Sequence, residues 1–168
     1  DWHKNSVLGA ERAANISPTG WALNRGMIFT SHHDAPVAFP DSMRVLSATV
    51  NRTTRTGEVL GPEQRVSPLV ALKTQTLWAA YQYFEEKSKG SIEVGKVADL
   101  VVLSENPLKI DPLKISAIKI EQTIKDGKVV YQRDAQASAG MSCSESASCF
   151  KLASHTMAMG GVFPACQH

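Results

Sequence analysis

The stretch "IEQTIKDGKVVYQ", residues 120–132, alternates apolar and polar side chains on both sides of Asp126-Gly127. A two-residue Asp-Gly connection between such runs is the strongest short-range signal for a β-hairpin. Upstream, from Gly90, the runs "GSIEVG" and "KVADLVVLSE" are short, apolar and bounded by turn residues, which is typical of strands. The sequence therefore predicts a small antiparallel β unit over residues 90–132.

Helical patterns precede this unit. The clearest covers "SPLVALKTQTLWAAYQYFEEK", residues 67–87, where Ser67 can cap the helix and Pro68 suits its first position. Apolar residues recur in it at helical spacing and are expected to pack in the core: Leu69, Leu72, Leu77, Ala80, Tyr81 and Phe84.

Two shorter helices are predicted nearer the N-terminus. Asp41 can cap a helix in "DSMRVLSATV". Its apolar side is formed by Met43, Val45, Leu46, Thr49 and Val50. Ser17 can cap a second one, before Pro18, that ends near Gly26 in a left-handed cap.

Between these helices, "MIFTSHHD", residues 27–34, is rich in β-branched and aromatic residues and predicts a buried strand. Residues two apart share a face of a strand, so His32 and Asp34 are expected to point one way and His33 the other. In a parallel barrel, functional groups lie at the carboxyl ends of strands. The cluster could hold a metal, move a proton, or only hydrogen-bond a turn.

The order of elements, strand and helix first and a β unit last, indicates an α/β domain joined to a β-rich one. Only one convincing parallel-type strand precedes residue 90, and one strand with three helices is not a stable layered architecture. The β unit of residues 90–132 is likewise too small to bury a good core alone. We therefore expect part of the fold to be missing on the N-terminal side.

Composition excludes some classes of function. The 168 residues carry a formal net charge of +2 and no run of like charges, so no nucleic-acid partner is expected. No stretch approaches the roughly 18 apolar residues that span a bilayer, so no membrane partner is expected either. The chain opens on "DWHKN", without Met or a signal peptide, which indicates processing or a piece of something longer.

The three cysteines, Cys143, Cys149 and Cys166, all lie near the C-terminus. Three hypotheses fit this odd count: one disulfide with a free thiol, a metal cluster with His155 and His168, or incidental thiols in a loosely structured tail. We favour the last. Tail cysteines incline slightly towards an oxidising location, and the choice between cytoplasm and periplasm stays open.

Several of these stretches together resemble a known family. They are "GAERAANISPTGWALNRGMIFTSHHDAPVAFP", "NRTTRTGEVLGPEQRVSPLVALKTQTLWAAYQYFEE", "KGSIEVGKVADLVVLSENPL" and "IKDGKVVYQ". They are similar to the C-terminal part of metal-dependent amidohydrolases, in the subgroup often called amidohydrolase family 3, which includes N-substituted formamide deformylase-like proteins. The resemblance runs from about residue 1 to residue 132. "SHHDAPV" is similar to the family's H-x-D-A-P-V.

The resemblance implies the C-terminal fragment of a (β/α)8 TIM barrel followed by part of a composite β-sandwich. Residues 1–88 would be the end of the barrel, and residues 89–133 strands of the sandwich. Residues 134–168 would be a tail of uncertain structure. The missing N-terminal barrel portion is then a partner, and association of identical copies stays open.

The resemblance also implies site residues. Asp34 would contact a divalent metal, expected to be zinc, and would take the proton of the hydrolytic water. His32 would orient Asp34 or hydrogen-bond the developing oxyanion. Arg12 would bind a small-molecule substrate of amide or formamide type, and His3 could face the site.

The family's other metal ligands have no counterpart in this sequence. A catalytic zinc wants at least three protein ligands, so we expect the chain alone to be inactive. The rival hypothesis is a non-catalytic remnant or assembly module that joins a complementary chain through exposed strands.

Overall fold

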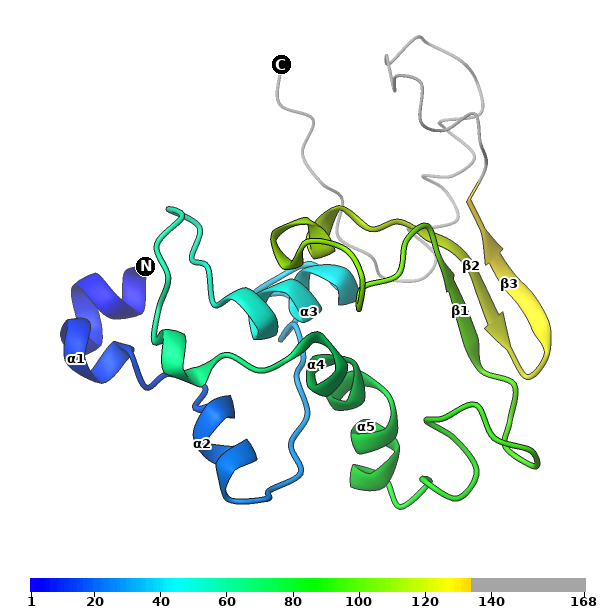
Figure 1. Cartoon of the computed structure of the whole chain (residues 1–168). Helices are drawn as coiled ribbons and strands as arrows, with labels where there is room; N and C mark the ends of the chain where they lie inside the picture. The colour runs from blue at the N-terminus through cyan, green and yellow to red at the C-terminus, as the bar shows by residue number, and fades with distance from the viewer. Residues whose placement is uncertain (134–168) are drawn as a thin grey trace, which may run out of the picture. The chain divides into compact units, whose positions relative to one another are not determined.

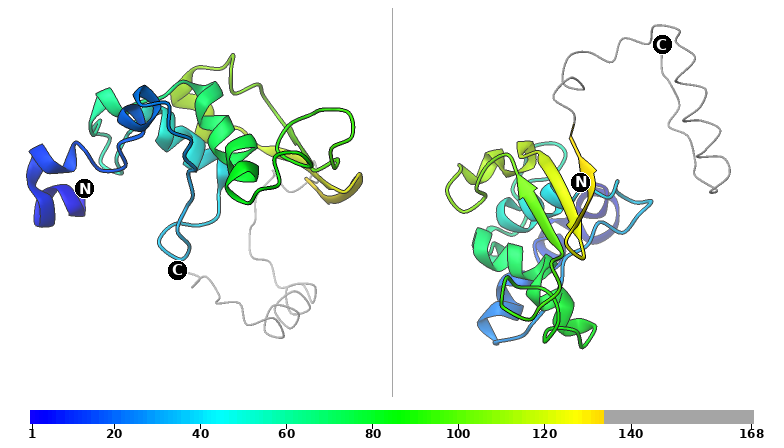
Figure 2. Two further views of the ribbon diagram at one scale, coloured as in Figure 1. Left: turned by 90° about the horizontal axis from the view of Figure 1, so that it is seen from below. Right: turned by 90° about the vertical axis from the view of Figure 1, so that its right-hand side faces the viewer.

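A computed structural model describes residues 1–133 (Figure 1). Its helical elements are η1 (His3–Leu8), α1 (Gly9–Ala13), α2 (Thr19–Asn24), α3 (Ser42–Asn51), η2 (Pro62–Gln64), α4 (Pro68–Gln75), α5 (Leu77–Gln82) and η3 (Pro112–Ala117). Its strands are β1 (Leu100–Leu103), β2 (Ile120–Lys125) and β3 (Lys128–Gln132). In two views, α3, α4 and α5 lie between α1 at one end of the unit and the sheet at the other (Figures 1 and 2).

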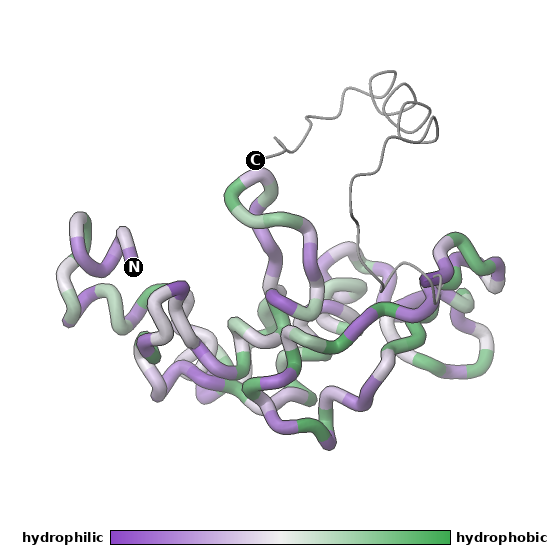
Figure 3. The backbone as a smooth tube through the Cα atoms, turned by 90° about the horizontal axis from the view of Figure 1, so that it is seen from above, coloured by the Kyte–Doolittle hydropathy of each residue, from purple (hydrophilic) through white to green (hydrophobic). Residues whose placement is uncertain are grey.

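The three strands form one antiparallel sheet in the order β1-β2-β3. The predicted hairpin is confirmed: Asp126 and Gly127 connect β2 to β3 with φ of 49° and 74°, the left-handed values of a tight hairpin turn. Strand β1 is the uninterrupted apolar "LVVL". Along the described backbone, hydrophobic and hydrophilic segments alternate (Figure 3). The strand expected at "GSIEVG" is wrong, because Ile92 and Val94 lie in an exposed irregular segment that pairs with no described strand.

The core lies where α3, α4 and η3 meet. Its buried apolar residues are Met43, Leu46, Val50, Val66, Ala71, Ile115 and Ile118. The predicted apolar side of α3 is thus largely confirmed. The predicted N-cap is confirmed as well, since Asp41 Oδ1 accepts hydrogen bonds from the backbone N–H groups of Met43 and Arg44.

The long helix predicted after Ser67 forms as two. Ser67 caps α4 as expected, but Thr76 departs from helical geometry at φ −125° and ψ −97°, and α5 begins after it. Its apolar stripe packs only in part as predicted, since Leu72 lies partly buried against the core. Ala80 is buried, whereas Leu69 and Tyr81 are about half exposed and Phe84 is 91% exposed. These large side chains have no covering layer in the part of the chain that the structure describes.

Helix α2 ends as predicted, since Gly26 has a φ of 66° just after it. Its predicted cap is wrong. The N-cap is Pro18, which offers no side-chain acceptor, and Ser17 precedes it with a φ of 49°. One acceptor comes instead from Gln64, whose Oε1 accepts a hydrogen bond from the backbone N–H of Trp21. A buried side chain distant in sequence therefore does what a local cap would do.

The strand predicted at residues 27–34 is also wrong for this unit. Residues 28–33 have no strand pairing, and within residues 1–133 their backbone N–H and C=O groups bond to no other backbone group. A parallel strand needs a neighbouring strand to donate and accept these bonds, and the described chain supplies none.

The mixture of helices and strands agrees with the predicted α/β class. The barrel fragment, the sandwich and their boundaries stay predictions. No helix within residues 1–133 is long and apolar enough to cross a membrane. The hypotheses on Cys143, Cys149 and Cys166 lie outside the described residues.

Candidate functional site

Side-chain contacts hold the segment of residues 28–33 against two helices. The ring of Phe29 meets Trp78 of α5 edge to face, with centroids 5.2 Å apart. Thr30 Oγ1 donates to Gln82 Oε1 at 2.8 Å, also on α5. On α3, the hydroxyl groups of Thr49 and Ser31 are hydrogen-bonded, with Oγ1 and Oγ 3.3 Å apart. The two histidines that follow are therefore presented from a fixed segment.

Both imidazoles hold the turn that follows this segment. His32 Nδ1 accepts the backbone N–H of Asp34 at 3.1 Å, and His33 Nδ1 accepts that of Ala35 at 3.2 Å. The turn closes where Val37 N donates to Asp34 O at 2.7 Å. Nδ1 of each ring therefore holds the turn, as one of the predicted alternatives states. Nε2, on the opposite edge of each ring, is not used by the turn and can take part in other chemistry.

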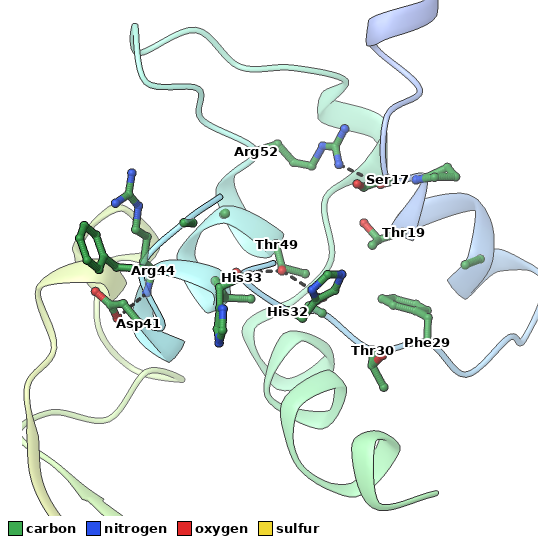
Figure 4. Close-up of a pocket in the computed structure, with 17 residues that line it drawn as sticks. Ser17, Thr19, Phe29, Thr30, His32, His33, Asp41, Arg44, Thr49 and Arg52 are labelled. Carbon is green, nitrogen blue, oxygen red and sulfur yellow. Dashed lines mark hydrogen bonds between the residues drawn. The ribbon is translucent and has the colours of Figure 1, made fainter. Parts of the chain in front are cut away.

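A cavity of about 580 Å³ opens beside these histidines (Figure 4). It lies between α2, the segment of residues 28–33 and α3. Hydroxyl groups line it from Ser17, Thr19, Thr30, Ser31 and Thr49, and apolar surface comes from Phe29, Phe39, Val45 and neighbouring small residues. It can hold a small molecule with an apolar body and a few hydrogen-bonding groups.

A second cavity of about 420 Å³ shares part of this lining. Thr30, Ser31, His32 and His33 line both cavities. The remaining wall of the second cavity is formed by Ser42, Val45, Thr74, Gln75, Ala79, Gln82 and Tyr83. No side chain in this lining carries a formal charge when the histidines are neutral, so the cavity suits a neutral polar group.

Arg52 forms part of the wall of the first cavity. It follows α3 in the left-handed conformation, with φ 58° and ψ 29°. Its guanidinium donates from Nε to Leu60 O, from Nη1 to Ser17 O and from Nη2 to Ile16 O, at 2.8, 2.9 and 2.6 Å. Burial lowers the pKa of Arg52, and the charge of Glu63 partly opposes this shift.

The residues predicted for the site are not all brought together. His32 lines both cavities, as described above. Asp34 is exposed, has a φ of 57° and lines neither cavity. Arg12 lies exposed in α1 and lines neither. His3, in η1, stacks edge to face on Trp2 with ring centroids 5.1 Å apart. The roles proposed for them stay predictions.

The resemblance implies a metal ion, which would need several ligands from His, Cys, Asp or Glu side chains. Within residues 1–133, no three His, Cys, Asp or Glu side chains form a group that could hold a metal ion. Asp34 offers one carboxylate, and the Nδ1 atoms of His32 and His33 are occupied by backbone N–H groups. The described residues do not make a metal site by themselves.

Arg52 and Gln64 shape the site, and sequence reasoning missed both. Left-handed positions after a helix usually carry Gly or Asn, so an Arg there gives no signal. Gln64 is fully buried, with Nε2 lacking a hydrogen-bond partner among the described residues, although a glutamine in a polar loop predicts exposure.

Known proteins are similar to this chain in sequence and in structure. The sequence model described as "Amidohydrolase family" matches residues 1–131. The chain is 29% identical over 130 residues to "Putative amidohydrolase YtcJ" of Bacillus subtilis, covering 75% of this chain and 24% of that protein. It is 28% identical over 118 residues to "N-substituted formamide deformylase" of Arthrobacter pascens, covering 70% of this chain and 22% of the relative.

Among solved structures, an amidohydrolase from Thermotoga maritima is similar at a TM-score of 0.50 and 25% identity. The match covers 76% of this chain and 27% of that one. The chain therefore spans about a quarter of the length of the proteins it matches.

Proposed function

Because this chain belongs to the amidohydrolase family, we propose that it forms the C-terminal part of a hydrolase that cleaves an amide-type carbon–nitrogen bond outside peptides. The family match over residues 1–131 carries the proposal, since that range includes both "SHHDAPV" and "KGSIEVGKVADLVVL". A formamide-type substrate is supported by the printed name of the Arthrobacter relative.

The unpaired backbone of residues 28–33 supports a barrel. Six consecutive residues without backbone partners would be costly in the interior of a protein, and flanking barrel strands would satisfy them. We propose that residues 1–88 end a (β/α)8 barrel and that residues 89–133 join a composite β-sandwich. The partner of this chain is then the upstream portion of the same fold.

In the complete site, Asp34 is the proposed proton carrier. A carboxylate at the end of a barrel strand takes a proton from the attacking water and returns it to the leaving nitrogen, because an amide anion is a poor leaving group. Members of this family generally use a divalent metal, which, when bound, would lower the pKa of a coordinated water. Since the described residues do not form a metal site, most ligands of that ion, proposed to be zinc, must come from outside this range.

The test uses the chain together with its natural upstream sequence. Asp34→Asn keeps the size and removes the base, so we expect turnover of an N-substituted formamide to fall by about 10²–10⁴-fold. Asp126→Asn, in the hairpin turn, is the matched control and should leave turnover unchanged. Undiminished turnover in Asp34→Asn would remove that residue from the mechanism.

The second candidate, an assembly module without catalysis, is supported by the sheet. Val101, Val102, Val129 and Val130 are 42% to 61% exposed, so neither face of the sheet is fully covered. Inactivity of the longer chain on all amide substrates, with tight binding of a second polypeptide to this sheet, would favour the module over the enzyme.

A further inference from the structure

A neutral imidazole carries one N–H, and the bond made by one ring nitrogen fixes the state of the other. We propose that His32 and His33 are a pair of hydrogen-bond donors, each presenting Nε2–H to a carbonyl-type oxygen of a neutral ligand, and that neither is a metal ligand through Nε2.

The backbone geometry carries the assignment. The N–H groups of Asp34 and Ala35 can only donate, and they meet Nδ1 of His32 and His33 at 3.1 and 3.2 Å. Nδ1 must therefore be the acceptor in each ring, and the ring proton of the neutral form resides on Nε2. An Nε2 that carries a proton has no lone pair for a metal, so metal binding there would require breaking a turn bond.

The position of the rings defines what they can bind. His32 is exposed and His33 is half-buried, and both line the two cavities. Neither Nε2 has a hydrogen-bond partner within residues 1–133, whereas the neighbouring hydroxyl of Thr30 is already bound to Gln82. Figure 4 shows the two rings pointing in different directions from one segment, with His32 on the side of Thr49 and Phe29.

The class of ligand follows from charge in the second cavity. The first cavity, which both rings also line, has Asp41, Arg44 and Arg52 in its lining, so the neutral ligand is assigned to the second. The second cavity is lined by hydroxyls, amides and these imidazoles, with no carboxylate, ammonium or guanidinium among its residues. Such a lining cannot neutralise an ion, but two N–H donors suit carbonyl oxygens. Only the identity of this carbonyl as a substrate amide rests on the proposed function; the protonation pattern and the neutral ligand class do not.

The test is nuclear magnetic resonance on the whole ¹⁵N-labelled chain at mildly alkaline pH, where free imidazole is neutral. Long-range ¹H–¹⁵N spectra distinguish a protonated from an unprotonated ring nitrogen, and His32→Gln and His33→Gln variants assign the signals. We expect Nε2–H for both residues. His3, whose ring nitrogens have no partner within residues 1–133, serves as the internal control. Nδ1–H, or the averaged pattern of His3, at position 32 or 33 would overturn the assignment.

Two additions complete the experiment. Zinc alone should leave the ring signals of His32 and His33 in place, and a metal-bound pattern at either residue at stoichiometric zinc would contradict the proposal. Acetamide should shift both signals more than equimolar acetate, with His3 unmoved. A larger shift with acetate, or none with acetamide, would refute the neutral ligand class. Neither outcome depends on hydrolysis, so an inactive longer enzyme would refute the proposed function without touching this result.

Discussion

At the scale of single residues, Arg52 is the C-cap of α3, connects two loops by hydrogen bonds and lines the first cavity. One guanidinium satisfies carbonyl groups from Ile16, Ser17 and Leu60, and its planar fork matches their separate directions. Lysine offers a point charge and cannot reach three divergent acceptors together. Each carbonyl left without a donor in this half-buried region costs free energy.

Arg52→Lys should therefore lower the free energy of unfolding by about 2 kcal/mol, on the scale of lost hydrogen bonds to a charged group. Urea denaturation followed by circular dichroism measures this change. Arg44→Lys is the matched control, because Arg44 is exposed on α3 and its side chain has no hydrogen-bond partner within residues 1–133. Equal stability of the two variants would show that the carbonyl contacts contribute nothing.

A second residue-scale prediction concerns Glu58. Its carboxylate accepts a hydrogen bond from Lys4 Nζ at 2.8 Å, and this bond with the charge of Lys4 lowers the pKa of Glu58. A lowered pKa contributes stability above the ordinary pKa of glutamate, and that contribution is lost as pH falls through the folded value. Lys4→Met should raise the Glu58 titration midpoint, measured by ¹³C resonance. An unchanged midpoint would show that the pair does not form in solution.

At the scale of elements, local chemistry decides where helices start. Asp41 is expected to contribute to α3 as an N-cap through the two backbone N–H groups that its Oδ1 accepts. Asp41→Ala should lower the free energy of unfolding by about 1 kcal/mol, whereas Asp41→Asn should be nearly neutral because Asn caps as well. Thermal melts of both variants test this. A loss of equal size in both would assign the effect to the charge instead of the cap.

The elements that the sequence predicts correctly are those with local causes. The caps at Asp41 and Ser67 and the Asp126-Gly127 turn depend on neighbours within a few residues, and all are confirmed. The strand at residues 27–34 depends on partner strands, and it is absent where those partners are absent. Periodicity shows that a helical face is apolar, but not whether anything covers it, as the 91% exposed Phe84 illustrates.

The same distinction between local and long-range causes applies to the candidate site. The pattern His-His-Asp marks the segment, and His32 does line a cavity. Which atom of each ring is free depends on turn geometry, and the loop anchors at Arg52 and Gln64 lie far from their partners in sequence. Contacts between residues 35 or more positions apart leave no trace in a local pattern, so this part of the site could not be predicted.

At the scale of the whole molecule, the described unit leaves much apolar surface uncovered. Val37, Phe39 and Tyr83 are each at least 75% exposed, and the valines of the sheet are about half exposed. Monomeric soluble proteins rarely keep large apolar patches in water, and such patches mark surfaces that bind other protein. In the larger enzyme that we propose, the upstream portion of the fold would cover these patches.

The sheet offers the sharpest test at this scale. Val101→Thr, Val129→Thr and Val130→Thr combined should keep the hairpin, since threonine has high strand propensity, while lowering fluorescence of a hydrophobic dye and self-association in sedimentation experiments. Val66→Thr makes the same chemical change at a side chain only 6% exposed, so it should instead destabilise the fold by about 1–3 kcal/mol. Unchanged dye binding in the triple variant would show that the sheet is already covered in solution. That result would remove the uncovered surface as a reason to seek the rest of the barrel and sandwich.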